Sequence, residues 1–166
     1  MDKEIDAWMR RVKEIQKSED ISNDEDLSIA LMNLISLEEH LYFTAMKTNN
    51  QKYLELLQSL REVRKKIMKK MLNEPKGEEW CISKHLLGAS MRVYEAGCRE
   101  LSSGRKKEAN GYFADAFSLW SAFFAIKLKM IGMEELDRNA FEKERSGKMG
   151  KLSALMRKII ECCKDW

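Results

Sequence analysis

The sequence predicts an all-α protein, an antiparallel four-helix bundle with an additional amphipathic helix at each end. Its 166 residues include one proline and eight glycines, so residues that interrupt helices are rare. Apolar residues recur every three or four positions along several long stretches, as on one face of a helix. The breaks between these stretches are short, as between antiparallel neighbours. The length suits one domain spanning residues 1–166.

Residues 3–17 form the predicted N-terminal helix, since five apolar side chains share one helical face. These are Ile5, Trp8, Met9, Val12 and Ile15. After a polar break, Ser22 and Glu25 have the spacing of a capping box, so we expect the second helix to begin near residue 24. It runs to about Lys47. Its apolar stripe consists of Leu27, Leu31, Leu34, Ile35, Leu41, Tyr42 and Ala45.

Residues 48–50 make the next turn, and the third helix ends before Pro75, because proline disfavours helix at the preceding residue. The fourth helix spans about 78–102 and the fifth about 105–131, which completes a bundle core over about 24–132. The fifth is the most hydrophobic. Its broad apolar face contains Tyr112, Phe113, Ala116, Phe117, Trp120, Phe123, Phe124 and Ile131.

Residues 133–150 are highly charged and contain two glycines, which indicates a short helix and a linker. A C-terminal amphipathic helix over 151–165 follows. Both terminal helices carry an apolar stripe that must be buried, either on the bundle or on a second subunit. Aromatic side chains favour interfaces, and both ends carry tryptophan, Trp8 and Trp166. We therefore expect a protein that acts through self-association, most simply as a homodimer, or through other protein interactions.

Three charged side chains fall within apolar stripes, namely Glu38, Arg64 and Lys127. A buried charge without a partner is costly, so we expect inward-facing partners, such as Glu38 with Arg64. The alternative is that these long side chains extend to solvent at a helix end. The fourth helix is apolar around most of its circumference, which predicts a central position. Its narrow polar stripe consists of Cys81, Lys84, His85, Gly88, Arg92, Glu95 and Arg99.

The polar stripe suggests a ligand site between the second and fourth helices. Mostly apolar walls with a few convergent polar groups are typical of small-molecule sites, here for an anion. The candidate residues are Glu38, Arg64, Lys84, His85, Arg92 and Glu95. A divalent metal ion is the alternative ligand. Cys81 and His85 are four residues apart on one helix and could bind it together with Glu39.

Nucleic-acid binding is a further alternative, because basic residues crowd the third helix and could contact phosphates. They are Arg61, Arg64, Lys65, Lys66, Lys69 and Lys70. Against it, 30 basic residues are nearly balanced by 27 acidic ones. No nucleophile constellation and no glycine-rich phosphate loop is visible, so we do not expect an enzyme.

No apolar run reaches the length of about 20 residues that spans a bilayer, and the first residues do not form a signal peptide. We expect a soluble cytoplasmic protein that does not enter membranes. The four cysteines are Cys81, Cys98, Cys162 and Cys163, and in that compartment they are reduced thiols.

Two segments resemble an uncharacterised family of small archaeal and bacterial helical proteins. The first is Ser36-Leu37-Glu38-Glu39-His40-Leu41, and the second runs from Trp80 to Leu87, followed by Met91-Arg92. The resemblance covers roughly residues 26–130. It implies a helical bundle and carries no established activity.

Overall fold

The computed structural model describes residues 3–15, 21–131 and 148–159, and every regular element in these ranges is a helix. The all-α class is therefore confirmed. The helices are α1 (Lys3–Ile15), α2 (Ile21–Thr48), α3 (Lys52–Met71), α4 (Glu79–Ser102), α5 (Lys106–Lys127) and α7 (Lys148–Ile159). Most of the charged segment 133–150 lies outside the described residues, as does the end of the predicted C-terminal helix.

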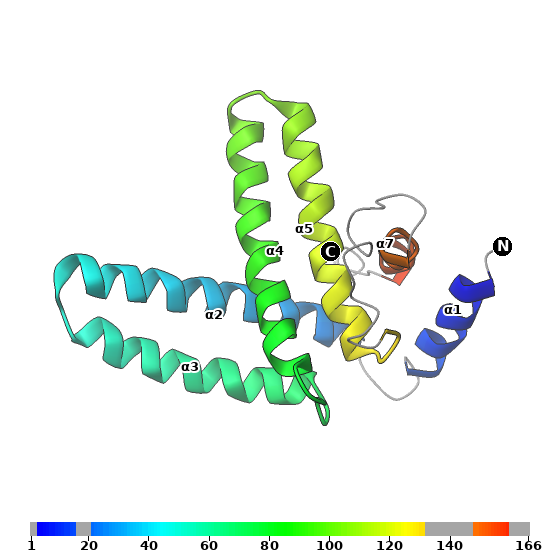
Figure 1. The fold of residues 1–166 in the computed structure, drawn as a ribbon, viewed down its shortest axis with the longest axis horizontal. Helices are drawn as coiled ribbons and strands as arrows, with labels where there is room; N and C mark the ends of the chain where they lie inside the picture. Colours follow the sequence, from blue (N-terminus) through cyan, green and yellow to red (C-terminus); the bar gives the residue numbers. More distant parts are fainter. Residues whose placement is uncertain (1–2, 16–20, 132–147, 160–166) are drawn as a thin grey trace.

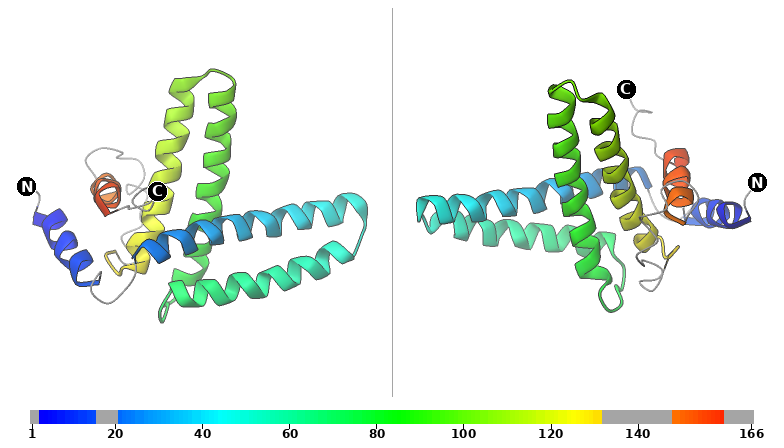
Figure 2. Two further views of the ribbon diagram at one scale, coloured as in Figure 1. Left: turned by 180° about the vertical axis from the view of Figure 1, so that it is seen from behind. Right: turned by 45° about the horizontal axis from the view of Figure 1, so that its top comes forward.

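Two antiparallel helical hairpins, α2–α3 and α4–α5, form the body of the molecule (Figure 1). The hairpins cross steeply and do not run side by side, as both views in Figure 2 also show. A single antiparallel four-helix bundle is therefore not confirmed. Helix α4 contacts both α5 and α2, which agrees with its predicted central position. Each hairpin extends beyond the crossing as a two-helix arm.

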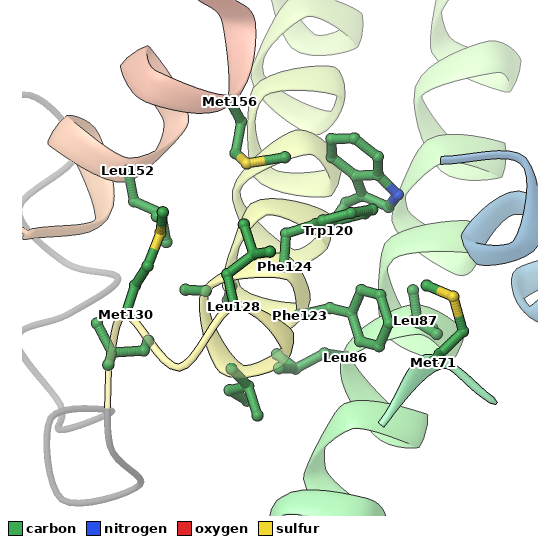
Figure 3. Close-up of a cluster of buried hydrophobic side chains, with 14 of the residues drawn as sticks. Met71, Leu86, Leu87, Trp120, Phe123, Phe124, Leu128, Met130, Leu152 and Met156 are labelled. Atoms are coloured by element: carbon green, nitrogen blue, oxygen red, sulfur yellow. The ribbon is translucent and has the colours of Figure 1, made fainter. Parts of the chain in front are cut away.

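The core lies where the hairpins cross. Figure 3 shows Phe123, Phe124 and Trp120 of α5 packed with side chains of α3, α4 and α7. The described parts of both terminal helices join this core, through Trp8 of α1 and Leu155 of α7 among others. The sequence leaves open whether the terminal helices pack on their own chain or on a second subunit. Their described residues pack on the core of the same chain.

Close contact at the crossing depends on Gly88 of α4. A Cβ atom at this position would lie 3.1 Å from Cγ2 of Ile35 on α2, so glycine allows the two helices to approach. Nearby, the Trp120 indole Nε1 donates a hydrogen bond of 2.9 Å to the Ser28 hydroxyl, which joins α5 to α2 inside the core. These contacts fix where along α2 the second hairpin crosses.

Two predicted core residues, Tyr42 and Tyr112, are exposed. Both lie on an arm beyond the crossing, where no neighbouring hairpin covers that side. The predicted capping box is also wrong, since α2 begins at Ile21 and Ser22 lies inside its first turn. Helix α3 ends at Met71, before Pro75, as predicted.

Two ion pairs tie the ends of the helices to the core. Lys127 Nζ lies 2.6 Å from a carboxylate oxygen of Asp24, and the Lys127 side chain is 6% exposed. The sequence leaves open whether Lys127 faces inward or extends to solvent, and its side chain is buried and paired. At the start of α4, the Glu79 carboxylate accepts hydrogen bonds from Lys129 Nζ, at 2.7 Å, and from the backbone N–H of Lys76, at 2.9 Å.

Stability at acid pH should depend on Glu79. The hydrogen bonds from Lys129 and from the Lys76 backbone lower the pKa of its carboxyl. Its contribution is therefore complete above the ordinary glutamate pKa of about 4.3 and is lost as the pH falls through the lower folded value. We expect Glu79→Gln to reduce stability by about 1 kcal/mol or less at pH 7, because the Lys129 side chain is 41% exposed and solvent weakens the pair. Denaturant unfolding at pH 7 and pH 3 measures this, and a variant that loses as much stability on acidification as the parent contradicts it.

Candidate functional site

An open hollow of about 660 Å³ lies in the corner between α2 and α4. Eight of its lining residues come from one side of α2, and Arg92 comes from α4. The lining residues are Asn33, Ser36, Leu37, Glu39, His40, Phe43, Thr44, Lys47 and Arg92. We call this hollow the α2–α4 corner. It is the place where the sequence predicts a site, although most of its residues differ from the predicted ones.

Arg92 of α4 lines one wall of the corner. Its guanidinium Nε lies 3.1 Å from a carboxylate oxygen of Glu39, and its Nη2 donates a hydrogen bond to the Ser36 hydroxyl. Arg92 is 51% exposed and Glu39 is 46% exposed, so this pair adds little to stability. Its main effect is geometric, because it ties α4 to residues 36–39 of α2, next to the crossing at Ile35.

Exposed apolar side chains give the corner its unusual character. Phe43 is 66% exposed and Leu37 is 40% exposed, and both line the hollow. The Phe43 ring packs edge-on against Tyr42, with 5.1 Å between ring centroids, and Met46 beside them is also exposed. Clustered exposed apolar side chains mark interaction surfaces more often than isolated ones do.

The predicted ligand residues do not converge on the corner. Arg64 Nε and Nη2 donate to the two carboxylate oxygens of Glu38, at 2.8 and 3.1 Å. The predicted pairing of these two charges is thus confirmed, but they satisfy each other in the α2–α3 interface. Lys84, His85 and Glu95 do not line the hollow, so Arg92 alone of the six belongs to it.

The predicted metal ligands are likewise not assembled. Glu39 pairs with Arg92, and Cys81 and His85 are exposed on α4. Within the described ranges, no group of three or more His, Cys, Asp or Glu side chains is placed to hold a metal ion. Spacing along one helix brings two ligands together, but a third must come from a neighbouring element.

The basic face of α3 is smaller than predicted. Arg64 is buried against Glu38, and Lys65 Nζ lies 2.8 Å from a carboxylate oxygen of Glu62. The remaining four basic residues are exposed, namely Arg61, Lys66, Lys69 and Lys70.

Comparisons with known proteins give no relative: no family model, no curated protein and no solved structure matches this chain. The family resemblance inferred from residues 26–130 stays a prediction. Among the described helices, none is both long enough and apolar enough to cross a membrane.

Most residues of the corner lie outside the two features that the sequence makes prominent, the core stripe of α2 and the polar stripe of α4. The missed residues lie on the outer side of α2. Asn33, His40 and Lys47 are seven residues apart, as are Ser36 and Phe43, so they share one side of the helix. Four of these five side chains are polar, so the spacing alone gave no signal for a partner helix.

Proposed function

We propose that this protein acts through protein association rather than catalysis, and that the α2–α4 corner is where it binds a second copy of itself. The observation that carries the proposal is the exposure of Phe43 and Leu37 within an open hollow. Burying a phenylalanine side chain contributes roughly 1.5–3 kcal/mol. Aromatic and methionine side chains beside arginine are also the composition that interfaces favour.

The α2–α3 arm supports this choice of surface. Beyond the crossing, the arm consists of two helices that cover each other on one side only. Among the described residues, seven large apolar side chains on this hairpin are exposed, against three on the α4–α5 arm. Those on the α2–α3 hairpin are Ile29, Leu37, Tyr42, Phe43, Met46, Leu56 and Val63. A second copy would cover part of this surface and would remove it from water.

Three other functions that the sequence suggests have less support from the arrangement of the described residues. A small anion between α2 and α4 would have to compete with Glu39 for Arg92. A metal ion lacks a third ligand among the described residues. Nucleic-acid binding through α3 retains four exposed basic side chains, without an aromatic residue among them on which bases could stack.

Association is tested by the substitution Phe43→Glu. We expect the parent protein to sediment at high concentration as a dimer, with twice the chain mass of 19.4 kDa, and to dissociate on dilution. The variant should remain monomeric, because a carboxylate would be buried against the partner. Phe43 lies outside the core, so its helix content and melting should match the parent.

The matched control is Leu101→Glu, which introduces the same charge at a leucine of 48% exposure on the other arm. It should dimerise as the parent does. A parent protein that stays monomeric at its highest soluble concentration contradicts the proposal, and so does a Phe43→Glu variant that dimerises unchanged.

A further inference from the structure

No further inference is drawn: the strongest candidate, the exposed side of α2 in the α2–α4 corner with His40, Phe43 and Lys47, belongs to the site already described, and among the described residues nothing shows what covers it.

Discussion

Replacing Glu38 by leucine should destabilise the protein by about 3–5 kcal/mol, the cost of leaving a buried charge without its partner. The Arg64 side chain is 4% exposed and donates two hydrogen bonds to the Glu38 carboxylate. Removing the carboxylate leaves the guanidinium in an apolar helix interface, without the acceptor that offsets its lost hydration. Urea unfolding followed by circular dichroism measures the change.

The double variant Glu38→Leu/Arg64→Leu should recover most of the lost stability, because an apolar pair of similar volume replaces the ion pair. Glu62→Leu is the matched control. It removes the exposed ion-pair partner of Lys65 on α3, the helix that carries Arg64. The free energy of unfolding should therefore stay essentially unchanged. If the single and double variants at residues 38 and 64 are equally unstable, packing rather than charge explains the loss.

Replacing Phe123 by alanine should also cost about 3–5 kcal/mol, because it opens a cavity at the centre of the crossing. Phe123 is fully buried and packs edge-on against Phe124, with ring centroids 5.3 Å apart. The surrounding side chains come from both hairpins, so collapse around the cavity would require both hairpins to move. Thermal and denaturant unfolding should both report the loss.

Leu101→Ala on the α4–α5 arm provides the comparison, since Leu101 is exposed outside the core. It should change stability by less than about 0.5 kcal/mol. Equal losses for the two variants would mean that the arm carries as much packing energy as the crossing, contrary to the distribution of burial described above.

Local features of the fold were predictable from the sequence. Helix type, the end of α3 before Pro75 and the inward pairing of Glu38 with Arg64 all depend on residues within one helix or on two adjacent helices. Gly88, which the sequence places in the polar stripe of the fourth helix, lies close to Ile35 of α2. Periodicity and charge burial decide such features over short distances.

The angle between the hairpins was not predictable in this way. An apolar stripe shows that a helix face is buried, but not whether the covering helix runs along it or across it. Tyr42 illustrates the difference. It continues the apolar stripe of α2 in sequence. However, α4 crosses that stripe near Ile35 and does not cover Tyr42, which is therefore exposed. Most residues that line the α2–α4 corner were not predicted for the same reason, because a corner exists only where two hairpins cross.

The crossed arrangement also bears on how the chain folds. Each hairpin joins helices that follow one another in sequence, so most of its contacts close short loops and form quickly. The crossing joins segments much farther apart in the chain, such as Ser28 and Trp120. Folding is therefore expected to divide into two local events and one docking step. The arm tips, which among the described residues are held by their own hairpin, should exchange amide hydrogens before the residues at the crossing do.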